Sequence, residues 1–155
     1  GVQTCALPIF SDTNLSVIHI EQHVPASRTK TFDIFSNYEN YSQILPSIFP
    51  SVRIRSVRNN TAVSEEHIEF GNSELVVMAK HVLNPPVLHE IFFIGGSAKG
   101  TSIKQQFLDF ENGTKVIIDI DYKPDKTKFL SKLVGKSKTS ENFEKIFNAF
   151  FECCK

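Results

Sequence analysis

The chain has 155 residues, and its 17 basic and 17 acidic side chains leave no formal net charge at neutral pH. A chain of this length forms one domain, which buries roughly two-thirds of the surface its unfolded form exposes and needs no disulfide or metal to fold. The balanced charge provides no global field to attract nucleic acid, so we expect no nucleic-acid partner.

Fourteen phenylalanines and no tryptophan fit either a Phe-rich core or a cavity lined with rings, because cores and apolar pockets share a composition. No stretch approaches the ~20 apolar residues of a membrane span. The three cysteines, Cys5, Cys153 and Cys154, form neither a metal-ligand spacing nor a disulfide framework. We therefore expect a soluble, monomeric protein of the reducing cytoplasm.

The first nine residues, GVQTCALPI, resemble the translation of a sequencing-library adapter, and an ordinary flexible terminus is the alternative. We therefore interpret residues 1–14 as a disordered or artefactual segment. The folded domain is expected to span residues 15–155.

The first predicted element is a half-buried strand, because apolar and polar residues alternate around Ile18 and Ile20. The tripeptide Pro-Ala-Ser at 25–27 then predicts the start of a helix in which Phe32 and Phe35 share one face. A second short helix is expected over residues 41–45.

After Pro50, short alternating segments predict six strands, with turn residues at 59–61, 71–72, 85 and 112–113. Each turn predicts the register of its hairpin. The predicted cross-strand pairs include Arg55–Glu65, Ile68–Leu75, His81–His89 and Lys104–Asp121.

The chain ends in an apolar stripe with helical spacing, formed by Phe143, Ile146, Phe147, Phe150 and Phe151. The predicted fold is therefore α+β, with a curved antiparallel sheet of about seven strands around a long C-terminal helix. A gap remains wherever side chains on the helix and the sheet fail to meet.

This order of elements resembles the START-like helix-grip (SRPBCC) superfamily, in particular its branch of polyketide cyclases/dehydrases and coenzyme Q-binding proteins. The similarity rests on PASRTKTFDIFSNYENYSQILP after the first strand, GGSAKGT at 95–101 and NGTKV at 112–116. It extends from Leu15 to the end of the chain. The resemblance implies a cavity between helix and sheet that accepts apolar small molecules, but the sequence offers no catalytic acid or base motif to carry over.

The expected ligand-binding residues lie on the inner face of the sheet and on the terminal helix. They are Ile68, Phe70, Val77, His81, His89, Ile91, Phe93, Gln105, Phe107, Ile118, Ile120, Phe143, Phe147 and Glu66.

Four of these expected residues, Glu66, His81, His89 and Gln105, are polar. They could lie at partly wet strand ends, satisfied by backbone or water. They could instead bind the polar end of a ligand, which would offset the roughly 1–3 kcal/mol cost of an unpaired buried polar group. In a third interpretation, Glu66 or a histidine is a general acid–base group for cyclisation or dehydration.

Glu65, His67 and Glu69 alternate on the predicted outer face. Side chains two residues apart on a strand stand about 6.6 Å apart, too far to converge on one ion with bonds of about 2 Å. We interpret them as a solvated charge ladder and expect neither a metal nor another cofactor.

Six lysines lie between Lys123 and Lys138, interleaved with apolar residues. The segment 123–138 is interpreted either as an amphipathic helix start or as a surface for transient contact with anionic lipid.

The leading predicted function is non-enzymatic binding or transfer of a hydrophobic small molecule, such as a lipid, an isoprenoid quinone or a polyketide-like compound. One alternative is an enzyme of the polyketide cyclase or dehydratase type. The second alternative is a ribosome-associated or other interaction protein with a vestigial cavity.

Overall fold

The computed structural model describes residues 17–125 and 135–155, and it describes the side chains of the terminal helix from residue 138. The predicted segment 1–14 and most of the lysine-rich segment lie outside these residues. Seven strands form one antiparallel sheet in the order β1-β7-β6-β5-β4-β3-β2. Their bounds are β1 Val17–Val24, β2 Ser51–Arg58, β3 Thr61–Phe70, β4 Ser73–Asn84, β5 Leu88–Gly96, β6 Ser102–Phe110 and β7 Gly113–Asp121.

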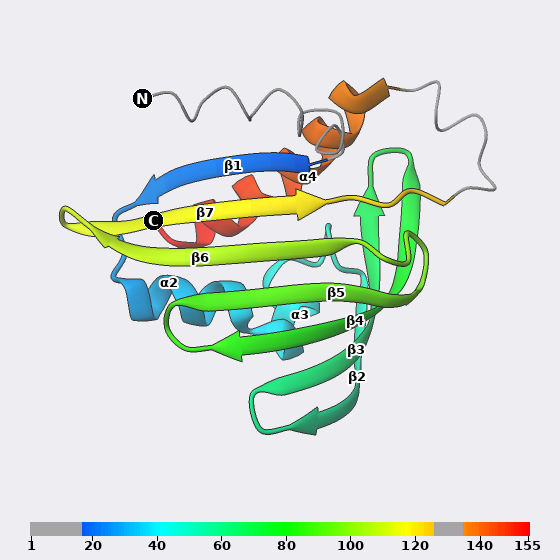
Figure 1. Ribbon diagram of the computed structural model, residues 1–155, viewed down its shortest axis with the longest axis horizontal. Coiled ribbons are helices and arrows are strands. Elements are labelled where there is room, and N and C mark those ends of the chain that lie inside the picture. The colour runs from blue at the N-terminus through cyan, green and yellow to red at the C-terminus, as the bar shows by residue number, and fades with distance from the viewer. Residues whose placement is uncertain (1–16, 126–134) are drawn as a thin grey trace, which may run out of the picture.

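The helices lie on one face of the curved sheet (Figure 1). Their bounds are α2 Arg28–Ser36, the 3-10 helix η2 Tyr38–Asn40, α3 Tyr41–Ile44 and α4 Gly135–Cys153. Helix α2 begins where the tripeptide at 25–27 predicts, because the Ser27 hydroxyl accepts a hydrogen bond from the Lys30 backbone N–H at 3.3 Å. The predicted α+β helix-grip architecture is therefore confirmed.

The core is held together by aromatic contacts that join elements distant in the chain. Phe35 of α2 is fully buried. Its ring lies 5.5 Å from Phe107 of β6 in an edge-on arrangement and stacks on Phe150 of α4 at 5.1 Å. Aromatic pairs at these separations add about 0.5–1.5 kcal/mol beyond their buried area. Phe35 thus connects the sheet to both main helices.

The predicted register is right for β3–β4 and displaced in the other hairpins. Ile68 pairs with Leu75 as expected. In β6–β7, Lys104 pairs with Asp119 instead of Asp121, because the turn occupies residues 111–112. Gly113 is the first residue of β7 and pairs with Phe110. It packs closely on β1, where a Cβ at this position would lie only 2.1 Å from the Val24 carbonyl oxygen, so no larger residue fits.

The β4–β5 turn is also one residue further along the chain than predicted. His81 pairs with Ile91, whereas His89 pairs with Leu83. The turn runs through residues 85–87 and is closed by a hydrogen bond from the Val87 N–H to the Asn84 carbonyl oxygen at 2.9 Å. Prolines at 85 and 86 have no N–H to donate, so the first available donor is at 87.

The β2–β3 turn occupies residues 59–60, and β2 carries a bulge between Ile54 and Ser56. Glu65 therefore pairs with Arg53 in the ladder, not with Arg55. The Arg55 guanidinium still reaches the Glu65 carboxylate at 2.5 Å. All three displacements preserve the inner and outer faces, because each hairpin keeps its alternation.

We expect Phe35→Ala to lower the free energy of unfolding by about 3–5 kcal/mol, because it removes a fully buried ring shared by three elements. Urea unfolding measures the loss. Val57→Ala, at a side chain that is 55% exposed, is the matched control and should change stability by less than about 0.5 kcal/mol. Similar losses in both variants would contradict the assigned core.

Candidate functional site

A cavity of about 30 Å³ lies between the inner face of the sheet and α4. Its lining is mostly apolar and comes from the sheet, from α4 and from the segment that joins β1 to β2. The lining residues are Tyr41, Phe49, Glu66, Ile68, Phe70, Leu75, Ile91, Phe93, Ile103, Gln105, Phe143, Ile146, Phe147 and Phe150.

Many of the predicted ligand-binding residues line this cavity, and the others are buried beside it. The ones that line it are Glu66, Ile68, Phe70, Ile91, Phe93, Gln105, Phe143 and Phe147. The ones buried in the core without lining it are Val77, His81, His89, Phe107, Ile118 and Ile120.

Sequence reasoning missed several lining residues for different reasons. Ile146 and Phe150 belong to the apolar stripe of α4, so its helical spacing was a sufficient signal. Tyr41 and Phe49 come from the irregular segment between β1 and β2, which carries no strand or long-helix period.

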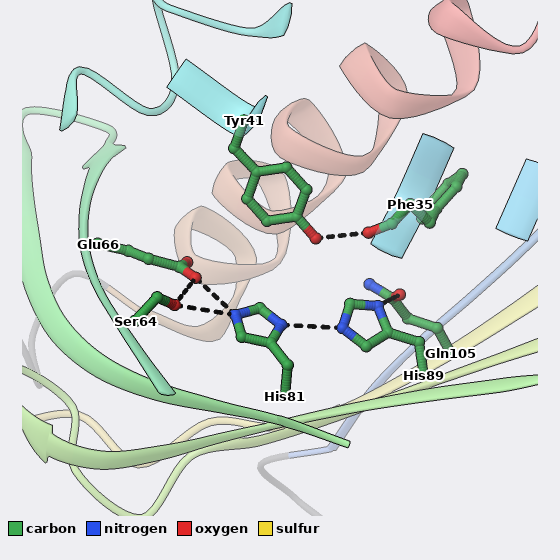
Figure 2. Close-up of polar contacts among 7 residues, drawn as sticks. All are labelled: Phe35, Tyr41, Ser64, Glu66, His81, His89 and Gln105. Carbon is green, nitrogen blue, oxygen red and sulfur yellow. Dashed lines mark hydrogen bonds and ion pairs between the residues drawn. The ribbon is translucent and has the colours of Figure 1, made fainter. Parts of the chain in front are cut away.

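A continuous chain of hydrogen bonds crosses the inner face of the sheet beside the cavity (Figure 2). Glu66 Oε1 lies 2.6 Å from His81 Nε2, His81 Nδ1 lies 2.9 Å from His89 Nε2, and His89 Nδ1 lies 2.7 Å from Gln105 Oε1. The Ser64 hydroxyl also donates to Glu66 Oε1 at 2.6 Å. These residues come from four adjacent strands, β3 to β6.

All five residues of this polar chain are buried. None of their exposed fractions exceeds 2%. The interpretation of partly wet strand ends is therefore wrong, because the four predicted polar residues are buried and hydrogen-bond to one another. Ser64 was not predicted, although it shares the inner face with Glu66 two positions along the same strand.

Aromatic rings hold the two histidines of the polar chain in place. The imidazole rings of His81 and His89 stack at 5.2 Å, and the Tyr38 ring stacks on His81 at 4.7 Å. The displacement of the β4–β5 turn by one residue makes the histidines diagonal partners in the sheet, and in this arrangement their ring nitrogens lie within hydrogen-bond distance.

The hydrogen bonds assign the protons along the polar chain. Burial, together with the neighbouring His81, holds the pKa of His89 well below its ordinary value, so His89 is neutral. Because the carbonyl oxygen of Gln105 only accepts, His89 Nδ1 carries the hydrogen and His89 Nε2 accepts from His81 Nδ1–H. One proton then remains between His81 Nε2 and Glu66 Oε1.

Tyr41 lines the cavity near Glu66, but its hydroxyl is already engaged. It donates to the Phe35 carbonyl oxygen at 2.5 Å. Burial, and then the charge of Glu66, raise the pKa of Tyr41 well above its ordinary value. The phenol therefore stays neutral, and its hydroxyl proton is held in the hydrogen bond to Phe35.

Two members of the charge ladder predicted on the outer face, Glu65 and His67, are paired, whereas the cross-strand neighbour of Glu69 is the like-charged Glu74. Glu65 binds Arg55, and His67 Nδ1 lies 2.5 Å from Glu74 Oε1. Within residues 17–125 and 135–155, no three His, Cys, Asp or Glu side chains form a group that could hold a metal ion. No helix of the described residues is long and apolar enough to cross a membrane.

The family profile described as "Polyketide cyclase / dehydrase and lipid transport" matches residues 24–147. The chain belongs to this family. The START-like resemblance seen in the sequence is thereby confirmed. No curated protein sequence is similar enough to count as a relative.

Three solved structures show how closely the helix-grip fold is shared. TTHA0849 from Thermus thermophilus is 17% identical with a TM-score of 0.75, covering 88% of this chain and 94% of its own. A START superfamily protein from Mycobacterium smegmatis is 14% identical with a TM-score of 0.75, covering 89% and 96%. The Zhui aromatase/cyclase from Streptomyces sp. R1128 is 13% identical with a TM-score of 0.70, covering 89% and 93%.

We expect stability to fall on acidification because of His89. Above pH 6.5 this imidazole is neutral in both the folded and unfolded chain. Below pH 6.5 the unfolded chain binds a proton that buried His89 does not accept, so the free energy of unfolding falls by up to about 1.4 kcal/mol per pH unit.

Urea unfolding of the wild type and His89→Gln between pH 7.5 and 5.5 measures this effect. The variant has no imidazole at this position and should lose less stability than the wild type over that range. Equal pH profiles would show that His89 is protonated as easily in the folded chain as in the unfolded one.

Proposed function

We propose that the chain binds a hydrophobic small molecule between the sheet and α4 and carries it unchanged. The ligand classes that suit this space are lipids, isoprenoid quinones and polyketide-like compounds. The observation that carries the proposal is an otherwise apolar cavity with two polar side chains, Glu66 and Gln105, held in its wall by a buried hydrogen-bonded chain. Ligand pockets commonly combine apolar walls with a few convergent polar groups.

The cavity must enlarge to accept such a ligand. Its volume of about 30 Å³ is far below the roughly 300–1,000 Å³ of small-molecule pockets. The sheet side is braced by strand pairing, whereas α4 faces it with aromatic and aliphatic side chains. Within the described residues no hydrogen bond joins α4 to the sheet, although the Asn142 amide packs against Gly71 of the β3–β4 turn. Displacement of α4 therefore breaks no hydrogen bond to the sheet.

Acid–base catalysis is the second candidate, and the contact between Glu66 and His81 favours it. His81 Nε2 and Glu66 Oε1 lie 2.6 Å apart, within hydrogen-bond distance, and Glu66 also lines the cavity. A carboxyl group so placed could exchange a proton with a bound carbonyl compound, as a cyclase or dehydratase requires. No comparable observation favours the ribosome-associated alternative.

Membrane contact through the lysine-rich segment stays a prediction, because residues 126–134 lie outside the described part. At the described end of this segment, Lys123 is paired with Asp121 at 3.1 Å.

Native mass spectrometry of the purified protein, followed by organic extraction, distinguishes the two candidates. We expect a mass above that of the chain alone and recovery of an apolar compound that the protein leaves unchanged on re-incubation. A cyclised or dehydrated product, whose formation stops in Glu66→Gln, would support the enzyme instead.

A fluorescent probe tests the location of binding. We expect uncharged N-phenyl-naphthylamine to bind the protein and Phe147→Leu to change its affinity severalfold, because Phe147 lines the cavity. Phe151→Leu is the matched control, since Phe151 is buried on the same helix but packs on Phe35. Both variants should lose about 1–3 kcal/mol of stability. Equal changes in probe affinity would mean that the probe binds elsewhere.

A further inference from the structure

Two polar atoms of the hydrogen-bonded chain face the cavity without a protein partner. Glu66 Oε1 accepts from Ser64 and contacts His81, whereas Glu66 Oε2 makes no hydrogen bond within the described residues. Gln105 Oε1 is held by His89, whereas Gln105 Nε2 makes none. Since every fully enclosed polar side-chain atom of the described part has a partner, and both residues line the cavity, these two atoms point into it.

The chemical character of each free atom follows from its neighbours. Glu66 Oε2 is an acceptor wherever the shared proton lies, because that proton is held between Oε1 and His81. Gln105 Nε2 is a donor, because His89 Nδ1–H fixes the carbonyl end of the amide away from the cavity. His81 and His89 are therefore positioning residues for the groups that face the ligand.

The acceptor and the donor stand too far apart to bind one functional group. Glu66 lies on β3 and Gln105 on β6, with β4 and β5 between them. Three strand spacings separate their backbones by roughly 14 Å. The imidazole rings of His81 and His89 lie between Glu66 Oε1 and Gln105 Oε1, so the two side-chain ends do not converge. The cavity wall contributed by the strands between them is apolar and includes Ile91 and Phe93.

We propose that the ligand is an elongated apolar molecule with a hydrogen-bond donor at one end and an acceptor at the other. Its hydroxyl donates to Glu66 Oε2, and its carbonyl oxygen accepts from Gln105 Nε2. This inference rests on the proposed binding function and narrows its ligand class. A fatty-acid carboxylate has no hydrogen to donate to Glu66, and a quinone presents acceptors at both ends, so hydroxy-ketones are favoured over both.

Three rod-shaped biphenyls test this assignment by competition with N-phenyl-naphthylamine. The first carries a para hydroxyl on one ring and a para acetyl on the other. The second carries a methoxy group in place of the hydroxyl, and the third lacks the acetyl group. The wild type should bind the first about tenfold more tightly than either of the others, since each lacks one hydrogen bond.

Two variants should alter this selectivity at separate ends. In Glu66→Gln the amide oxygen takes the place of Oε1 and an NH₂ group faces the cavity, so the preference for hydroxyl over methoxy should disappear or reverse. In Gln105→Leu only the preference for the acetyl group should disappear. Ile103→Leu, in the same cavity wall, is the control and should shift all three affinities together.

The outcomes separate this inference from the function on which it rests. Equal binding of the three biphenyls by the wild type, with the naphthylamine still bound, would overturn the inference and leave the binding function. Preference for a donor at the Gln105 end would overturn it too, because the amide would then be reversed. Failure of the naphthylamine and all three biphenyls to bind would overturn both. The wild-type comparison decides between these outcomes even if a variant fails to fold.

Discussion

The structure depends on the packing of phenylalanine rings between α4 and the curved sheet. Strands hold one another by backbone hydrogen bonds, but α4 has no such bonds to the sheet in the described residues and relies on side chains alone. Phe143, near the middle of α4, contacts Phe70 of β3 at 4.9 Å, and Phe150, closer to the C-terminal end, stacks on Phe35 of α2 at 5.1 Å. These contacts are apolar and non-directional, so no hydrogen bond to the sheet prescribes the position of α4 above it.

That mode of attachment explains how a nearly filled interior belongs to a family associated with cyclases and lipid transport. The sheet supplies a wall whose geometry is set by seven paired strands. The polar chain is built entirely on that wall, on four adjacent strands, so its orientation does not depend on α4. On the proposed binding function, displacement of α4 would enlarge the cavity while the hydrogen-bonding groups on the sheet keep their positions.

Much of the fold was predictable because alternation along strands and helical spacing are local properties. Displaced turns shifted the predicted cross-strand partners, as with Lys104 in β6, yet left every inner-face residue on the inner face. Turn positions were harder, since they depended on close packing at Gly113 and on missing donors at the two prolines. The polar residues of the site were found by their face. The hydrogen bonds that join them could not be predicted in the same way. They depend on the spatial order of β3 to β6 and on the diagonal offset between β4 and β5, which no single hairpin pattern reveals.

The bonding of the polar chain has a consequence for how this site can diverge. Glu66, His81, His89 and Gln105 each use an atom that only its neighbour can satisfy. Replacing one member by a side chain without the same donor or acceptor leaves the next with an unmatched polar atom in a dry interior, so such single substitutions are penalised even where a full replacement would be tolerated. The four positions are therefore energetically coupled. Among relatives we expect substitutions at these positions to occur together. On the proposed binding function, this coupling would make ligand preference slow to change by single substitutions, whereas the apolar lining, which lacks directional bonds, could vary residue by residue.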